Sequence, residues 1–177
     1  MLVLSDDDLK KRLAEEDFSI HPSPMERAFN ANSINLRLDS TLLKYLPQTI
    51  RLGSAEIETR EIDLDAEGEY VLAPGEFILG TTLEEVVLSE RFAGYIETKG
   101  NIARAGIQIS NCDGHIDPGF RGHITLEIKN MQKDVSIRLI PGIYICQFFV
   151  YPLSSPSKHP YRGKYYGQDK PTPYRPD

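Results

Sequence analysis

Short runs of alternating apolar and polar residues, separated by turn residues, recur along most of this 177-residue chain. In the run at 34–39, for example, Ile34, Leu36 and Leu38 point to the same side of an extended strand. Gly, Pro, Asp and Asn clusters, such as those at 73–76 and 117–122, separate these runs. Many short strands with regularly spaced turns are typical of sandwiches, jelly rolls and barrels, so we expect a mainly β fold.

The chain length suits a single domain with a sizeable core. One helix is expected at the start, because Ser5 can cap it and Leu9 and Leu13 lie one turn apart; it should end near Asp17. The strands that the alternation predicts are 34–39, 49–52, 61–65, 69–74, 76–88, 93–98, 106–110, 123–130, 135–140 and 143–153.

Composition excludes several classes of protein. The net charge of -6 argues against a general nucleic-acid binder, which normally has a basic surface. No apolar run approaches the roughly 18 residues needed to span a bilayer, so we expect no membrane partner. The first residues turn acidic too early for a signal peptide, which favours a cytoplasmic protein. We expect Cys146 to be a small buried core residue, and Cys112 to lack a local base that would make it catalytic.

The C-terminal end differs in composition from the rest of the chain. Residues 153–177 contain five Lys or Arg and two acidic residues, with four of the nine tyrosines and five of the twelve prolines. Such a segment cannot build its own core. It is either a solvated tail or an arm that folds over an anionic, planar ligand.

Three short segments carry the residues that suggest chemistry. Glu127 lies on the polar face of a predicted strand; it is either solvated there or, in a pocket, a general acid or base. Asp117 begins a predicted type II turn, in which it either caps the turn or binds a sugar hydroxyl. Lys99 and Arg104 flank Gly100 at the start of a possible short helix, a weak pattern for binding phosphates.

Together, these segments resemble the core of the dCTP deaminase and dUTPase superfamily, on its deaminase side. That family has a basic residue followed by two serines, then an Arg and a Gly, an Ile-Asp-Pro-Gly turn with an aromatic residue, and a Leu-Glu strand. Residues 73–84 resemble its Pro-Gly-Glu strand, and 155–173 resemble its closing arm. The matching core residues are Lys99, Arg104, Gly106, Ile116, Asp117, Pro118, Gly119, Phe120, Gly122, Leu126, Glu127 and Asn130.

The resemblance implies a distorted jelly-roll or β-barrel subunit of the dUTPase-like type. The β domain would cover 1–153, and 154–177 would be an arm that closes over the nucleotide. It also implies a homotrimer with active sites between subunits, and dCTP bound with Mg²⁺. Zinc is not expected, because the H-x-E and P-C-x-x-C motifs of zinc deaminases are missing.

The resemblance also assigns roles to residues. Glu127 would be the general base that activates water to attack C4 of cytosine, and Asp117 would lie near the deoxyribose. The implied substrate-binding residues are Lys99, Gly100, Asn101, Arg104, Asp117, Phe120, Tyr161, Lys164 and Gln168.

Two departures from the family pattern bear on the activity. Gly100 and Asn101 replace the two serines, and Asp113 stands where a small residue is usual.

Our main expectation is a deaminase that converts dCTP to dUTP. A bifunctional enzyme that gives dUMP is the first alternative, because Asp117 corresponds to the carboxylate that positions hydrolytic water in dUTPases. A non-catalytic nucleotide-binding regulator on the same scaffold is the second.

Overall fold

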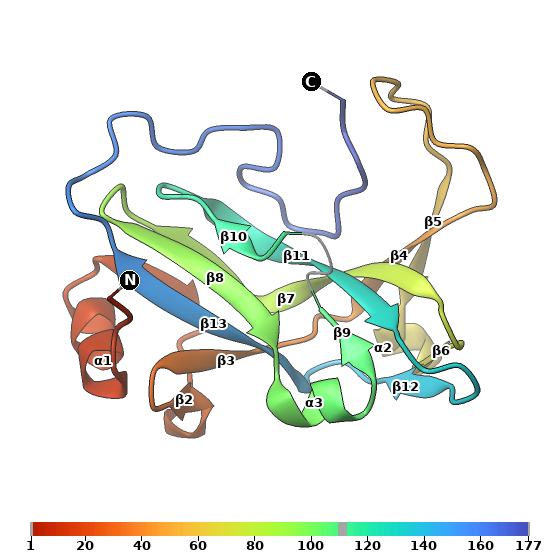
Figure 1. The fold of residues 1–177 in the computed structure, drawn as a ribbon, viewed down its shortest axis with the longest axis horizontal. Coiled ribbons are helices and arrows are strands. Elements are labelled where there is room, and N and C mark those ends of the chain that lie inside the picture. Colours follow the sequence, from red (N-terminus) through yellow and green to blue (C-terminus); the bar gives the residue numbers. More distant parts are fainter. Residues whose placement is uncertain (1, 110–112, 177) are drawn as a thin grey trace.

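Two packed antiparallel sheets form the body of the molecule (Figure 1). The computed structural model describes residues 2–109 and 113–176. One sheet has six strands in the order β5-β4-β7-β11-β9, with β1 also paired to β7; the other has five in the order β10-β8-β13-β3-β2. A separate two-stranded sheet pairs β6 with β12. The mainly β fold expected from the alternation is confirmed.

The elements in chain order are α1 (Asp6–Ala14), β1 (Phe18–His21), the 3₁₀ helix η1 (Glu26–Ala28), β2 (Phe29–Asn30), β3 (Ser33–Arg37), β4 (Thr41–Tyr45), β5 (Thr59–Asp63), α2 (Leu64–Glu67), β6 (Tyr70–Leu72), β7 (Phe77–Leu88), β8 (Phe92–Thr98), α3 (Gly100–Arg104), β9 (Ile107–Gln108), β10 (His115–Ile116), β11 (Arg121–Asn130), β12 (Ile137–Leu139) and β13 (Tyr144–Pro152).

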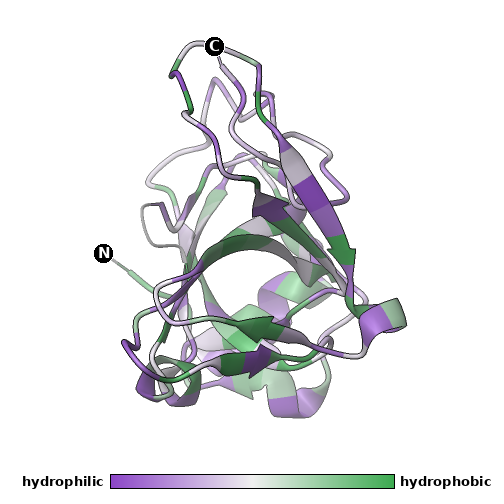
Figure 2. Cartoon of the chain, turned by 90° about the vertical axis from the view of Figure 1, so that its right-hand side faces the viewer, coloured by the Kyte–Doolittle hydropathy of each residue, from purple (hydrophilic) through white to green (hydrophobic). Residues whose placement is uncertain are grey.

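The core lies between the two large sheets and draws on the inward-facing side of each strand. Leu36 and Phe148 from one sheet and Ile78 and Leu126 from the other are all fully buried. Burial of each such side chain stabilises the fold by about 1.5–3 kcal/mol. Figure 2 shows hydrophobic residues along the curved strands and more hydrophilic ones in the loops at the upper end. Cys146 is buried in this core, as expected.

The first helix begins as predicted and ends earlier. The hydroxyl of Ser5 accepts a hydrogen bond from the backbone N–H of Asp8 at 3.4 Å. Glu16 then adopts a φ of +58°, and the N–H of Asp17 donates back to the carbonyl of Arg12. This bonding ends the helix three residues before the predicted end, at Ala14.

The predicted strand at 49–52 is wrong, and four strands were not predicted. Residues 49–52 lie in the loop between β4 and β5, where Leu52 is 79% exposed. Strands β1 and β4, and the two-residue strands β2 and β10, occur where the sequence pattern gave no prediction. The predictions on Cys112 fall outside the described residues. Among the residues that are described, no helix is long and apolar enough to span a membrane.

Candidate active site

A cavity of about 520 Å³ lies between residues of both large sheets and the C-terminal arm, which we define as residues 154–176. Strands β4, β7 and β11 form one wall, the segment 113–120 forms a second, and the arm covers it. The lining residues are Tyr45, Phe77, Leu79, Ile96, Asp113, His115, Ile116, Asp117, Phe120, Ile124, Thr125, Glu127, Tyr161, Lys164, Tyr165, Gln168, Thr172 and Tyr174.

Glu127 faces this cavity because of strand alternation on β11. Its neighbours Leu126 and Ile128 are fully buried in the core, so the side chain between them points to the other face, where it is half-buried. Across the sheet it pairs with Leu79 of β7. Burial raises the pKa of the Tyr45 phenol, the hydrogen bond from the backbone N–H of Tyr174 opposes this rise, and the Glu127 carboxylate nearby adds to it. A carboxylate and a protonated phenol therefore share this wall.

The predicted type II turn is present and fixes Asp117 and Phe120. Gly119 has a φ of +84°, and the N–H of Phe120 donates to the carbonyl of Asp117 at 3.1 Å. A side chain at Gly119 would approach Pro160 to within 2.5 Å, so glycine also allows the arm to pass close by. Asp117 remains exposed at the cavity rim, and Phe120 is buried beneath the arm.

The arm is attached to the sheet through several backbone contacts. Gln168 forms a parallel bridge with Gly122, and its side-chain amide donates to the carbonyl of His123 at 2.7 Å. The ring of Tyr161 lies 6.1 Å from the ring of Phe120, measured between centroids. The backbone N–H of Tyr161 donates to the carbonyl of Pro118. Lys164 lines the cavity and donates to the carbonyl of Arg175 at 2.9 Å.

Within the same chain, the predicted phosphate-binding residues lie away from the cavity that contains Glu127. Lys99 caps α3 and is followed by Gly100, Asn101 and Arg104 in that short helix. Figure 1 shows α3 at the opposite end of β8 from the arm. None of the four lines the cavity that contains Glu127. Within one chain, the structure therefore brings together only part of the predicted site, namely Glu127, Asp117, Phe120, Tyr161, Lys164 and Gln168.

Asp113 lines the cavity, and its carboxylate accepts a hydrogen bond from the backbone N–H of His115 at 3.0 Å. The unusual carboxylate therefore stabilises its own loop as an Asx turn.

Several lining residues were not predicted as site residues. Alternation on β11 places Thr125 on the same face as Glu127, so this residue was available from the sequence. Tyr45 was not, because its strand was not predicted. The tyrosines at 165 and 174 belong to the Tyr-rich end noted above.

Among residues 2–109 and 113–176, no group of three or more His, Cys, Asp or Glu side chains is arranged to hold a metal ion.

The sequence is similar to one known protein family and to named relatives over nearly its whole length. The family model described as dCTP deaminase-like matches residues 3–153. A Dictyoglomus thermophilum protein named "dCTP deaminase, dUMP-forming" is 35% identical over 98% of this chain and 94% of its own length. A protein of the same name from Mycobacterium tuberculosis strain CDC 1551 is 38% identical over 98% of this chain and 95% of its own.

Two solved structures share the fold at low sequence identity. The 2'-deoxycytidine 5'-triphosphate deaminase from Agrobacterium tumefaciens superposes with a TM-score of 0.64 and 18% identity, over 84% of this chain and 47% of that one. The present chain thus spans about half the length of that deaminase. A point mutant of the Staphylococcus bacteriophage 80alpha dUTPase gives a TM-score of 0.53 at 16% identity, over 84% and 97% of the two chains. The protein has the dUTPase-like fold and belongs to the dCTP deaminase-like family.

Proposed function

We propose that the protein deaminates dCTP and hydrolyses the resulting triphosphate, so that its product is dUMP. The observation that carries the proposal is Glu127, a carboxylate facing a cavity of about 520 Å³ with aromatic walls. This revises our main expectation of dUTP as the product, because the relatives that cover nearly the whole chain are named as dUMP-forming.

The deamination step needs one group that moves protons at C4 of cytosine. Glu127 accepts a proton from water as the oxygen adds to C4, and the proton then goes to the departing amine, which leaves as ammonia. The reaction is dCTP plus water to dUTP plus ammonia. The half-buried position of Glu127 on the cavity wall supports this role, because the side chain can approach a base bound in the cavity.

The second step breaks the bond between the α- and β-phosphates. Water adds to the α-phosphorus and pyrophosphate leaves, so dUTP plus water gives dUMP plus pyrophosphate. Asp117, exposed at the cavity rim on the type II turn, is our proposed residue for orienting this water or the deoxyribose. Mg²⁺ enters with the triphosphate and neutralises charge on its oxygens.

The triphosphate also needs cations, and we assign this role to Lys99 and Arg104 of a neighbouring copy in a homotrimer. Within its own chain α3 lies away from the cavity, which supports a site shared between subunits. The arm, 154–177, would close over the base and the phosphates with Tyr161, Lys164 and Gln168.

A product assay tests the proposal. The protein is incubated with dCTP and Mg²⁺, and separately with dUTP and Mg²⁺, and ammonia and pyrophosphate are measured independently. We expect ammonia and pyrophosphate in equal amounts from dCTP, with dUMP as the nucleotide product. Ammonia without pyrophosphate would identify a dUTP-forming deaminase, and nucleotide binding without either product would identify a regulator.

A further inference from the structure

A chain of three polar side chains runs from the cavity rim across the outer face of the five-stranded sheet. The Nε2 atom of His115 lies 3.3 Å from a carboxylate oxygen of Asp117. The Nδ1 atom of the same ring lies 2.9 Å from the hydroxyl of Tyr151. We call this set the Asp117–His115–Tyr151 network.

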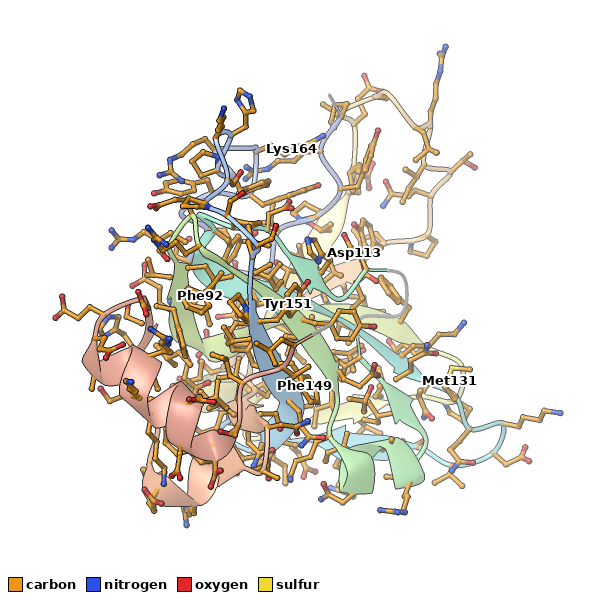
Figure 3. All side chains as sticks on the ribbon, turned by 60° about the vertical axis from the view of Figure 1, so that its left-hand side comes forward. Phe92, Asp113, Met131, Phe149, Tyr151 and Lys164 are labelled. Atoms are coloured by element: carbon orange, nitrogen blue, oxygen red, sulfur yellow. The ribbon has the colours of Figure 1, made fainter. Side chains whose placement is uncertain are left out.

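Sheet topology explains why these residues meet. His115 on β10 pairs with Tyr95 on β8, and Tyr151 on β13 pairs with Ala93 on the other edge of β8. Because Ala93 has only a methyl group, the Tyr151 ring can reach across β8 toward the imidazole. Asp117 follows His115 by two residues and therefore lies on the same side of the extended chain. Figure 3 shows Tyr151 on β13 between Phe149 and the end of the strand that leads into the arm.

The two contacts favour one placement of the protons on the His115 ring. A carboxylate only accepts hydrogen bonds, so the contact with Asp117 requires a proton on Nε2 of His115. When the ring carries only this proton, Nδ1 is an acceptor and the Tyr151 hydroxyl donates to it. Burial, followed by the nearby negative charge of Asp117, raises the pKa of Tyr151, which keeps the phenol protonated as this arrangement needs.

We propose that His115 and Tyr151 are positioning residues that hold Asp117 in one orientation for hydrolysis of the triphosphate. With one carboxylate oxygen bound by the imidazole, the other is left to contact the deoxyribose or the attacking water. Asp117 and His115 are 54% and 49% exposed, so without these bonds the carboxylate would be free to rotate in solvent. This inference rests on the proposed function.

The two chemical steps should depend on the network to different extents. Glu127 carries the proton at C4 and lies on β11, whereas the network lies on β10 and β13. Loss of the contacts that orient the Asp117 carboxylate should therefore slow pyrophosphate release more than ammonia release. The expected sign of the defect is an accumulation of dUTP when dCTP is the substrate.

Kinetics of single-residue variants test the role. For Tyr151→Phe we expect the kcat for pyrophosphate release from dUTP to fall roughly three- to tenfold, as for loss of one oriented hydrogen bond. For His115→Phe we expect a fall of about tenfold or more in the same kcat, with a change of less than about threefold in KM and in ammonia release from dCTP. Tyr95→Phe removes a phenolic hydroxyl from the same sheet face, outside the network. It serves as the matched control, and we expect it to have the kinetics of the parent protein.

A spectroscopic measurement tests the geometry without relying on activity. Long-range ¹H–¹⁵N correlation spectra of the histidine rings, assigned by loss of one ring in His115→Phe, report which nitrogen carries the proton. We expect Nε2–H for His115 in the parent protein, and a mixture of tautomers in Tyr151→Phe and in Asp117→Asn. An Nδ1–H ring in the parent would overturn the network.

The outcomes separate this inference from the proposed function. If the parent yields dUMP and Tyr151→Phe and His115→Phe leave the ratio of dUTP to dUMP unchanged, the positioning role is wrong. If the two steps slow equally, the network supports the fold rather than Asp117. A parent protein that releases no pyrophosphate would refute the proposed product and with it this role, whatever the tautomer of His115.

Discussion

At the scale of single residues, the cavity shows how strongly a strand restricts the side chains it carries. Glu127 reaches the cavity because the residues on either side of it belong to the core. A shift of one residue in the register of β11 would bury this carboxylate and expose the core side chains of the strand, Ile124, Leu126 and Ile128 among them. Its position is therefore maintained by the same apolar contacts that hold the two sheets together.

Gly100 offers a test of the departure from the family pattern. A Cβ atom there would meet only the Arg104 guanidinium at 3.8 Å, an ordinary contact, and its φ lies outside the left-handed region. Gly100→Ser should fold normally and place a hydroxyl where the family has one. We expect dCTP turnover to rise by up to about tenfold, the value of one well-placed hydrogen bond.

Steady-state kinetics of Gly100→Ser measure this change in dCTP turnover. Gly100→Ala is the control, because it adds a Cβ atom without the hydroxyl. A loss of activity in the serine variant alone would mean that a larger substrate group fills this space in the parent enzyme.

At the scale of elements, the long regular strands were predictable from the sequence and the short ones were not. Strand β7 has twelve residues, with a buried apolar start and alternating burial in its second half, and both its position and its length agree with the prediction closely. Residues 49–52 alternate over only four residues. There the amide of Gln48 bonds the backbone on both sides of the β4–β5 connection, with Leu46 and Glu58, so the chain between them loops outward.

Strand β1 is a strand that forms where the sequence pattern predicted none. Phe18 and Ile20 are buried because the far half of β7 supplies a partner strand, at Leu88 and Val86. Four residues before a proline carry too little local signal to predict a strand. The separation of α3 from the cavity was equally unpredictable from local pattern, because it depends on the three-dimensional path of β8.

The turn before β7 contains a partly buried ion pair whose effect on stability depends on pH. One Glu76 oxygen accepts bonds from Lys44 at 2.5 Å and from the Tyr70 hydroxyl at 2.6 Å. Burial alone would raise the pKa of Glu76, but these bonds and the N–H of Ala73 together lower it. A lowered pKa in the folded state stabilises the protein above the unfolded value of 4.5, and this contribution is lost as the pH falls through the folded value.

We therefore expect Glu76→Gln to reduce the free energy of unfolding at pH 7 by about 1 kcal/mol, the net value of a typical hydrogen bond. The deficit should shrink as the pH falls below 4.5. Urea unfolding at pH 7 and pH 3 measures both values, with the exposed Glu67→Gln as the control. A deficit that grows in acid would contradict the sign of the pKa shift.

The arm gives a prediction for a whole segment. A chain that ends at Leu153 keeps both large sheets and loses the cover of the cavity, including the contact between Tyr161 and Phe120. We expect circular dichroism to show a folded core, with stability reduced by about 1–2 kcal/mol from the lost aromatic contact. Turnover of dCTP should be abolished. Unchanged catalytic efficiency would show that the arm has no role in the reaction.

At the scale of the whole molecule, the distance between α3 and the cavity predicts that one chain is incomplete. A closed ring of three copies would supply the missing cations to each cavity from the next subunit. Light scattering should then give a particle of about 60 kDa, three times the 20.0 kDa chain. A monomer at micromolar concentration would contradict a shared site.

Mixing two inactive variants tests sharing directly. Glu127→Gln lacks the proposed base and Arg104→Ala lacks a proposed phosphate contact, so each should be inactive alone. In trimers co-assembled from equal amounts, a site is intact when its base comes from one variant and its arginine from the other. We expect about one quarter of the parent activity, because each condition is met half the time. Activity no higher than the sum of the separate variants would place both residues in the same chain's site.

The most direct test of the account is turnover of dCTP by Glu127→Gln. Glutamine keeps the size of the side chain and removes its capacity to accept a proton from water. We expect ammonia release to fall by at least about 10³-fold, near the upper range for a general base. Calorimetry should still detect dCTP binding with Mg²⁺, and the exposed Glu67→Gln should behave as the parent. A folded Glu127→Gln protein that releases ammonia at the parent rate would contradict the assignment of Glu127 as the base.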